Sequence, residues 1–258
     1  MIDLNLKGRK AVVTGASLGI GAAICKDLTA MGAEVFCCAR DPVALDELCS
    51  SSENITGFSA DLGDKSETET FLAEVKNLAG GIDIVINNVG ASPSRNFLYT
   101  EDKDWEDLHQ LNLMSAVRCT REFLPYMRQK KWGRVVMIAS SAAKYPSAAL
   151  IDYGATKAAL ISMSKSLARK YGRDGVLVNS VLPGLIHTAM WERAAKEIAD
   201  ANNTSVEDVI KKNGRTVPVG RYGTSEEVSA LVAFLCTDSA SYINGTSIEV
   251  DGGSAAHI

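Results

Sequence analysis

The stretch "TGASLGIG" at residues 14–21 decides the fold. It follows a short apolar run and opens a segment with helical spacing, and it holds Gly15, Gly19 and Gly21. Glycines permit a tight turn and close backbone approach, and the positive end of a helix attracts a pyrophosphate. The spacing differs from the standard G-x-G-x-x-G fingerprint, but the physics is the same. The stretch therefore predicts a dinucleotide-binding turn, and the alternative is a glycine-rich turn that serves only packing.

Apolar runs alternate with amphipathic segments along the whole chain. Near-continuous apolar runs are typical of parallel strands covered on both faces. Alternation with helices predicts an α/β, doubly wound Rossmann-type fold, with a seven-stranded parallel sheet and helices on both faces. We expect a single domain over 1–258. The expected strands are 10–15, 33–39, 54–60, 82–88, 134–140, 176–182 and 246–250, and the expected helices are about 19–31, 42–50, 64–79, 101–130, 152–171 and 224–236.

Two expected helices carry start signals. Pro42 after Asp41 fits a first-turn proline, and Thr224 with Glu227 is a capping box. These signals place the beginnings of the second and last helices.

Composition limits the classes of partner. The chain has 258 residues, 46% of them hydrophobic, with 27 Lys and Arg against 31 Asp and Glu. It has no long basic block, so nucleic acid is not an expected partner. The start lacks the apolar run of a signal peptide, and nothing approaches the roughly 20 apolar residues of a membrane span. We expect a cytoplasmic protein without membrane contact.

The six cysteines do not form a metal-binding pattern. No C-x-x-C occurs and the three histidines do not cluster with the cysteines. We expect reduced, mostly buried thiols and no metal site. Cys37 and Cys38 are adjacent on an expected strand, so their side chains should point to opposite faces of the sheet.

A second motif, "YGATK" at 153–157, places Tyr153 and Lys157 four residues apart. On a helix they would share one face. A nearby ammonium favours the phenolate, which would lower the pKa of the tyrosine toward neutral pH. The alternative is that Tyr153 packs in the core while Lys157 extends to solvent.

These motifs together give the sequence a family resemblance. It resembles the short-chain dehydrogenases/reductases over nearly its whole length, and within them the 3-oxoacyl-(acyl carrier protein) reductase-like subgroup. One departure is Val89 in "NNVG", where the family usually has alanine, and we expect the strand end to accommodate it. The resemblance rests on "TGASLGIG" (14–21), "NNVG" (87–90), Asn112 in "LNLMSA", Ser140 in "RVVMIAS", "YGATK" (153–157), "LPG" (182–184) and "INGTSIEVDGG" (243–253).

The resemblance implies four catalytic residues. Tyr153 would be the general acid/base, and Lys157 would lower its pKa and bind the nicotinamide ribose. Ser140 would bind the substrate oxygen, with Ser141 as its rival and a cap or turn serine as the alternative. Asn112 would hold a water that links Lys157 to solvent, or would otherwise be a surface or kink-forming residue.

The resemblance also implies a set of cofactor contacts. Ile20 would lie beneath the nicotinamide, Asp61 would take the adenine amino group, and Asn88 and Gly90 would face the ribose and adenine region. For Asp61 the alternative is a helix N-cap. The full set is Gly15, Ser17, Leu18, Gly19, Ile20, Gly21, Arg40, Asp61, Leu62, Asn88, Gly90, Tyr153, Lys157, Pro183, Gly184, Ile186 and Thr188, the last four as a clamp on the carboxamide and pyrophosphate.

The choice between NADP(H) and NAD(H) depends on the end of the second expected strand. NAD-preferring relatives usually carry an acidic residue where this chain has Ala39. Arg40 follows and suits a 2′-phosphate, although Leu18 stands where many NADP-linked relatives have a basic residue. Arg40 could instead be a solvated charge. The sequence favours NADP(H), with NAD(H) possible.

The implied activity is hydride transfer between NADP(H) and a small-molecule carbonyl or secondary alcohol. The alternatives are an NAD-linked secondary-alcohol dehydrogenase and a non-catalytic dinucleotide-binding sensor, which would usually lack Tyr153 or Lys157. Relatives of this size are commonly homotetramers built through 101–130, 152–171 and the C-terminal strand region. The tail "SAAHI" (254–258) could pack at such an interface.

Residues 189–215 lie between the clamp and the last expected helix. Apolar residues recur at helical spacing on either side of "DANNTS" (200–205), with Thr204 or Ser205 as a cap for the second piece. A helix–break–helix insert at this place predicts a substrate lid, in which Met190 and Trp191 could line the pocket. The alternative is a rigid helical hairpin, with both side chains in plain core packing. His187, beside the clamp, is expected to be a packing or solvent residue.

Overall fold

The computed structural model describes residues 3–255 of the chain, apart from the side chain of Met190. Its centre is one sheet in the order β3-β2-β1-β4-β5-β6-β7, in which every neighbouring pair is parallel. The predicted fold class is therefore confirmed. The strands are β1 (Lys10–Thr14), β2 (Glu34–Ala39), β3 (Ile55–Ser59), β4 (Ile84–Asn87), β5 (Gly133–Ile138), β6 (Val176–Pro183) and β7 (Ser247–Val250).

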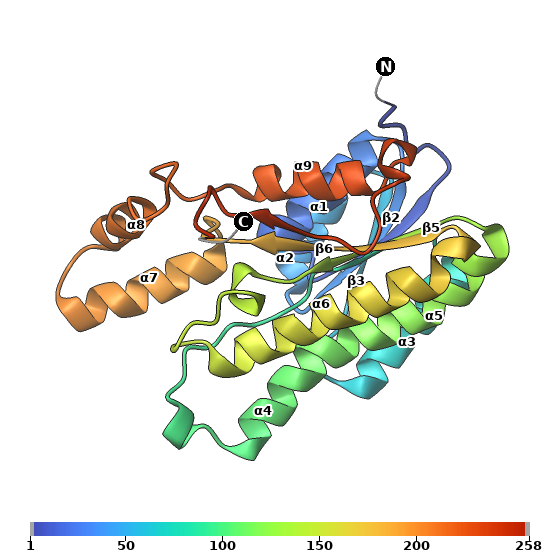
Figure 1. The fold of residues 1–258 in the computed structure, drawn as a ribbon. Helices are drawn as coiled ribbons and strands as arrows, with labels where there is room; N and C mark the ends of the chain where they lie inside the picture. Colours follow the sequence, from blue (N-terminus) through green and yellow to red (C-terminus); the bar gives the residue numbers. More distant parts are fainter. Residues whose placement is uncertain (1–2, 256–258) are drawn as a thin grey trace.

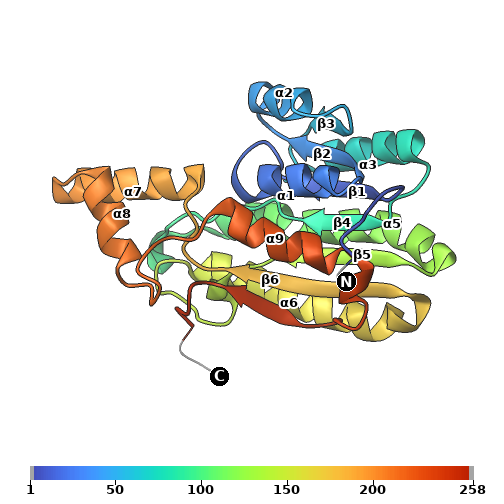
Figure 2. The ribbon, with the colours of Figure 1, turned by 90° about the horizontal axis from the view of Figure 1, so that it is seen from above.

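Helices cover both faces of the sheet (Figures 1 and 2). One face packs under α1 (Gly19–Ala30), α2 (Pro42–Ser50) and α9 (Ser225–Leu235), and the other under α3 (Lys65–Ala79), α5 (Ser115–Lys130) and α6 (Ile151–Tyr171). Each face has its own hydrophobic core, and Cys37 lies in the first while Cys38 lies in the second, as predicted. Among residues 3–255, no helix has the length and apolar character that crossing a bilayer requires.

The helix starts follow the sequence signals, with one correction. Asp41 caps α2 with Pro42 in the first turn, and Thr224 and Glu227 form a reciprocal capping box on α9. The cap of α3 is Asp64, whose side chain accepts a hydrogen bond from the backbone of Glu67. The alternative reading of Asp61 as this cap is therefore wrong.

The expected helix 101–130 is three segments. α4 (Asp102–His109) runs into a π-helical turn (Gln110–Met114), which continues as α5. Asn112 lies within this turn and is 1% exposed. A π turn inserts one extra residue into the helical ladder, and such turns are frequent at functional sites. Here it directs a polar side chain into the protein.

The turn between β1 and α1 depends on its glycines. Gly15 and Gly19 have φ values of +67° and +58°, which residues with a side chain rarely adopt. At Gly21 the constraint is space, because an added Cβ would lie 2.3 Å from the Gly15 carbonyl oxygen and 2.6 Å from the Asn88 amide nitrogen. The first turn of α1 is thus held against the loop that follows β4.

A methyl group at Gly21 should disrupt this turn. We expect Gly21→Ala to destabilise the protein by about 2 kcal/mol, because the clash is with backbone and cannot relax through a side chain. Thermal unfolding should show a midpoint lowered by roughly 4–8 °C. The control is Gly214→Ala on α8 (Val206–Gly214), where the added Cβ meets nothing closer than 3.4 Å. Equal midpoints for wild type and Gly21→Ala would contradict the steric argument.

Candidate active site

The predicted catalytic residues gather at the carboxyl ends of the central strands. Ser140 follows β5, Asn112 projects from the π turn, and Tyr153 and Lys157 come from the first two turns of α6. The adjacent strands β1 and β4 form the point where the strand order reverses, and open α/β sheets bind ligands there. The structure thus brings all four residues to the expected edge of the sheet.

Lys157 is 3% exposed and has no carboxylate partner among the described residues. Its ammonium donates a hydrogen bond of 2.8 Å to the carbonyl oxygen of Ile138, the last residue of β5. Burial disfavours the charged form and lowers the pKa of Lys157 to about 8. The alternative in which Lys157 extends to solvent is wrong.

Tyr153 is hydrogen-bonded to Ser140. Burial raises the pKa of Tyr153 above its ordinary value, while the bond to Ser140 acts in the opposite direction. The Lys157 ammonium lies 5.7 Å from the centroid of the Tyr153 ring. The sequence predicted a lowered pKa caused by Lys157, and that direction is wrong, since desolvation is the largest influence.

Ser140 and its rival Ser141 have different roles in the structure. Ser140 precedes the 3₁₀ turn Ser141–Ala143, and its hydroxyl oxygen accepts a hydrogen bond of 3.1 Å from the backbone of Ala142. It is therefore both a cap, as the alternative proposed, and the partner of Tyr153. Ser141 belongs to the turn itself, so Ser140 is the serine directed at the tyrosine.

Asn112 is fully engaged by its neighbours. Its amide exchanges two hydrogen bonds with the backbone of Ala91, of 2.9 and 3.0 Å, and donates a third to Thr156 at 3.1 Å. An added Cβ at Gly90 would lie 3.1 Å from the Lys157 ammonium and 3.2 Å from the Asn112 oxygen. Gly90 therefore leaves the space in which Lys157 and Asn112 approach each other. The surface alternative for Asn112 is wrong.

The glycine turn is tied to the β4 loop through Asn88. The Asn88 amide nitrogen donates to the carbonyl oxygens of Thr14 and Gly15, at 2.9 and 2.8 Å. Both hydrogens of that nitrogen are thus used in hydrogen bonds within the protein. Leu18 caps α1 without a side-chain hydrogen bond, so the first backbone N–H groups of the helix carry no side-chain acceptor. Val89 packs against the core, so the strand end accommodates it as predicted.

Other predicted contacts surround this turn. Ser17 and Ile20 are half-buried, and Leu18 is 54% exposed. Arg40 lies 3.8 Å from the Asp61 carboxylate, and both side chains are open to solvent. Leu62 is 2% exposed within the core, so only its backbone could meet a ligand.

The predicted clamp residues line the exit of β6. Pro183 ends the strand, and an added Cβ at Gly184 would lie 2.7 Å from Asp251. Ile186 is buried and pairs with Gly223. Thr188 caps α7 (Ala189–Asn202), and its methyl group would lie 3.3 Å from an added Cβ at Gly19. The clamp thus adjoins the glycine turn.

Aromatic side chains anchor the start of α7. Trp191 and His187 both meet the ring of Tyr222 edge-on, at centroid distances of 5.6 and 6.4 Å. His187 is half-exposed and lies 3.4 Å from Glu192. His187 is the packing and solvent residue that the sequence suggested, and Trp191 has the packing contact of its alternative. The predicted position of the Met190 side chain lies outside the described part of the chain.

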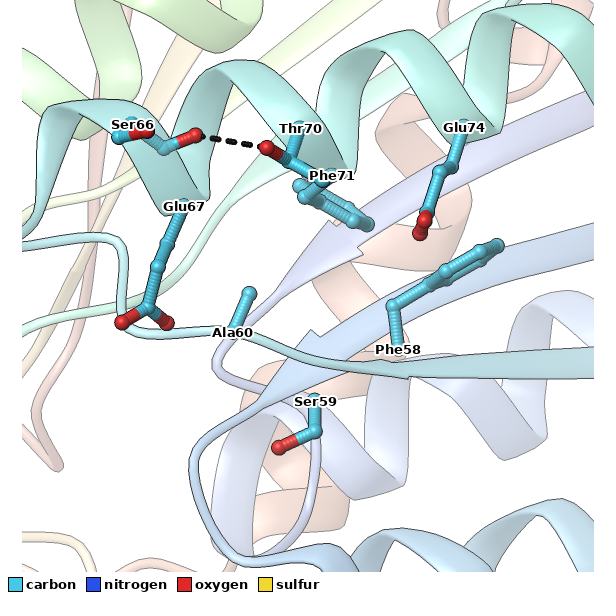
Figure 3. Close-up of a pocket in the computed structure, with 8 residues that line it drawn as sticks. All are labelled: Phe58, Ser59, Ala60, Ser66, Glu67, Thr70, Phe71 and Glu74. Carbon is cyan, nitrogen blue, oxygen red and sulfur yellow. Dashed lines mark hydrogen bonds between the residues drawn. The ribbon is translucent and has the colours of Figure 1, made fainter.

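The described residues hold no cluster of His, Cys, Asp or Glu suited to a metal ion. Two surface cavities lie away from the predicted catalytic residues. One of about 190 Å³ lies between β3 and α3, where Phe58 and Phe71 meet edge to face and Glu74 approaches Phe58 (Figure 3). It contains none of the predicted site residues and is separate from the catalytic group.

Sequence reasoning missed two threonines within the quoted motifs. The Thr14 hydroxyl oxygen accepts hydrogen bonds from the backbone of Asn88 and Val89, both of 3.0 Å. The Thr156 hydroxyl donates to the Tyr153 carbonyl oxygen at 2.8 Å and accepts the bond from Asn112. Thr14 belongs to "TGASLGIG" and Thr156 to "YGATK". A polar residue on the inward face of each motif could therefore have indicated these hydrogen bonds.

Comparison with known proteins agrees with this geometry. A family model described as enoyl-(acyl carrier protein) reductase matches residues 15–255. The uncharacterized oxidoreductase YvrD of Bacillus subtilis (strain 168) is 38% identical over 259 residues, covering 98% of each chain. The 3-oxoacyl-(acyl carrier protein) reductase FabG of Aquifex aeolicus (strain VF5) is 34% identical over 258 residues, covering 98% of this chain and 99% of its own.

A solved structure is similar over its full length. L-sorbose reductase from Gluconobacter frateurii, in complex with NADPH and L-sorbose, superposes with a TM-score of 0.95 at 31% identity, with 100% of both chains covered. The fold, the four gathered residues and these relatives lead to one conclusion. The chain belongs to the short-chain dehydrogenase/reductase family, in its 3-oxoacyl-(acyl carrier protein) reductase-like subgroup, and is an NAD(P)-dependent oxidoreductase of C=O and CH–OH groups.

Proposed function

We propose that this chain is an NADP(H)-dependent carbonyl reductase that uses Tyr153 as its general acid. The observation that carries the proposal is the hydrogen bond between Ser140 and Tyr153 beside the buried Lys157. The Tyr153 phenol carries its proton at neutral pH, so that proton is available to a carbonyl oxygen, and the nearby Lys157 ammonium favours the phenolate that is left.

The residues present fit a dinucleotide. The N-terminus of α1 has no side-chain cap, so its N–H groups can donate hydrogen bonds to a pyrophosphate. Arg40 is 70% exposed in its side chain and can pair with a 2′-phosphate. The complex of L-sorbose reductase with NADPH supports the same cofactor here. When bound, the nicotinamide supplies the hydride.

The protein then has three tasks. Ser140 and Tyr153 donate hydrogen bonds to the substrate oxygen, and Tyr153 transfers its proton as negative charge develops there. Lys157 places a positive charge within 5.7 Å of the ring and stabilises the resulting phenolate. Asn112 donates a hydrogen bond to Thr156 and lies on the route by which a proton returns to Lys157 and Tyr153.

The range of substrates that we propose is narrower than that of the whole family and broader than that of any one relative. Two of the named relatives are a 3-oxoacyl-(acyl carrier protein) reductase and an L-sorbose reductase, and the substrates in these names share a ketone on a polar chain. We propose this class of small molecule as substrate. The homotetramer and the cytoplasmic location remain predictions, and residues 256–258 of the tail that could pack at the interface lie outside the described residues.

The first test removes the phenolic hydroxyl. Tyr153→Phe should lower kcat by at least roughly 10²–10⁴-fold, because proton transfer is lost, while NADPH affinity stays within twofold. Steady-state assays on a panel of 3-oxoacyl thioesters, ketoses and cyclic ketones, with fluorescence titration of NADPH, measure both. Tyr171→Phe, on the same helix, is the control. A Tyr153→Phe protein that keeps most of its kcat would refute the mechanism and favour a sensor role.

The second test concerns the 2′-phosphate. Arg40→Ala should raise KM for NADPH roughly 10–100-fold, since a charge-assisted contact is lost, and should leave KM for NADH unchanged. Arg121→Ala, an exposed arginine on α5, is the control. A wild-type preference for NADH that Arg40→Ala does not alter would overturn the NADP(H) assignment.

We also propose that residues 189–215 form a lid. α7 and α8 pack on each other through Ala195, Ala199 and Val209, a small core separate from those of the sheet. Ser205 caps α8, as one of the two predicted caps. In Figures 1 and 2 the pair extends beyond the end of the sheet, on one side of the body.

The two ends of the lid meet at one place. The backbone of His187 donates to Gly223 and that of Gly223 donates to Leu185, both at 2.9 Å. The Arg221 guanidinium holds this junction by two hydrogen bonds of 2.8 and 2.7 Å to Glu227 on α9. A helical pair that has its own core, and whose two ends meet at one junction, can move as a unit.

Hydrogen exchange tests the lid directly. Amides of 189–215 should exchange faster than those of β4 and β5 in the unliganded protein and slow at least tenfold with cofactor and substrate. Amides of α5 provide the internal reference. Protection of 189–215 equal to that of the sheet without ligand would support the rigid hairpin instead.

A further inference from the structure

A partly buried ion pair lies one residue from the proposed general acid. The Arg95 guanidinium donates a hydrogen bond of 2.8 Å to the carboxylate of Asp152, which immediately precedes Tyr153. The Asp152 side chain is 4% exposed, whereas that of Arg95 is 28% exposed. Breaking a buried charge pair leaves an uncompensated charge, so such pairs hold their geometry firmly.

Both carboxylate oxygens of Asp152 are engaged. Oδ2 accepts from Arg95, and Oδ1 accepts a hydrogen bond of 2.8 Å from the backbone N–H of Tyr153. That N–H belongs to the first turn of α6, where intrahelical acceptors are lacking. Asp152 therefore fixes the backbone from which the tyrosine ring projects, and its own position is set by Arg95.

Arg95 is held on its other side by α4. Its Nη2 lies 3.1 Å from a carboxylate oxygen of Asp104, and the second oxygen of Asp104 accepts the backbone N–H of Glu101 at the start of the helix. One guanidinium thus joins the loop after β4, the start of α4 and the start of α6. α4 and α6 lie side by side in Figure 1.

A second contact runs parallel to the first. Ala91, in the same loop, bonds Asn112, which bonds Thr156 on α6. Asp152 and Thr156 are four residues apart, so they lie on one face of the helix. The loop 91–95 is therefore connected to that face at two residues, Asp152 before Tyr153 and, through Asn112, Thr156 after it.

We propose that Arg95 is a positioning residue for the reaction, which acts through Asp152 to hold Tyr153 against Ser140. This inference rests on the proposed function, because it assigns Arg95 to the same proton transfer. A displacement of about 1 Å in a reacting group can lower a rate roughly 100-fold. The expected signature is a loss in kcat without a loss in cofactor binding, since Arg95 does not adjoin the glycine turn.

The experiment is a double-mutant cycle with Arg95→Met and Asp152→Asn. Each single variant should lower kcat 10–100-fold and leave KM for NADPH within twofold. The double variant should be no slower than the slower single variant, because both changes break one device. Arg95→Lys, which keeps the charge, should recover at least part of the loss. Arg128→Met, which breaks the exposed 2.7 Å pair with Asp174, should stay within twofold of wild type.

A readout without turnover separates this inference from the proposed function. With ¹³Cζ-labelled tyrosine, the Tyr153 resonance is assigned by its absence in Tyr153→Phe. It should shift in Arg95→Met and Asp152→Asn, shift less in Arg95→Lys, and remain in place in Arg128→Met. A wild-type protein that reduces no carbonyl refutes the proposed function, while the resonance still tests the positioning. If Arg95→Met does not fold, Asp152→Asn carries the same test.

Two results would overturn the inference. One is full kcat with an unmoved Tyr153 resonance in the folded variants. The other is a double variant whose loss in kcat equals the product of the two single losses, with NADPH affinity and thermal stability falling as well. The pair would then have only a general structural role.

Discussion

The site depends on a buried lysine that has no carboxylate partner among residues 3–255. Lys157 is almost fully enclosed, and its ammonium donates a hydrogen bond of 2.8 Å to the carbonyl oxygen of Ile138. Desolvation of an ammonium in this position is unfavourable. Burial therefore lowers the pKa of Lys157 to about 8, and no ion pair compensates the charge among the described residues. Its charge is therefore adjustable near neutral pH, which a salt-bridged lysine would not allow.

The surrounding residues follow from that constraint. Gly90 has no side chain because the Lys157 ammonium and the Asn112 oxygen occupy the space a Cβ would approach. The π turn brings Asn112 inward to the same place, where Ala91 and Thr156 satisfy its amide. Tyr153 is hydrogen-bonded to Ser140, and burial raises the pKa of its phenol. The proposed chemistry thus uses one buried cation and one retained proton.

Sequence predicted the parts of this site that local patterns encode. The glycines of 14–21, the strand–helix alternation and the spacing of Tyr153 and Lys157 gave the sheet, the turn and the shared helix face. The burial of Tyr153, by contrast, cannot be read from a local sequence pattern. The i, i+4 pair suggested a lowered pKa for Tyr153, whereas desolvation raises it.

The contacts that sequence missed join distant segments. Arg95 and Asp152 are 57 residues apart, and their pairing depends on how the loop after β4 packs on α6. The π turn has the same origin, because its extra residue is stabilised by tertiary hydrogen bonds of Asn112 rather than by helix propensity. Asp61 and Asp64 were equally good caps by residue type, and only the backbone geometry distinguished them.

The measurement that tests this account most directly is the pKa of Lys157 itself. An NMR titration of the lysine side-chain ¹⁵Nζ and ¹³Cε resonances, with Lys157 assigned by comparison with Lys157→Met, gives that pKa in the folded protein. Our account predicts a midpoint near 8, with the ammonium fully charged well below that pH and neutral well above it. A midpoint at the ordinary lysine value of about 10.5 would contradict the account, because burial would then not have set the charge on which the proposed proton transfer depends.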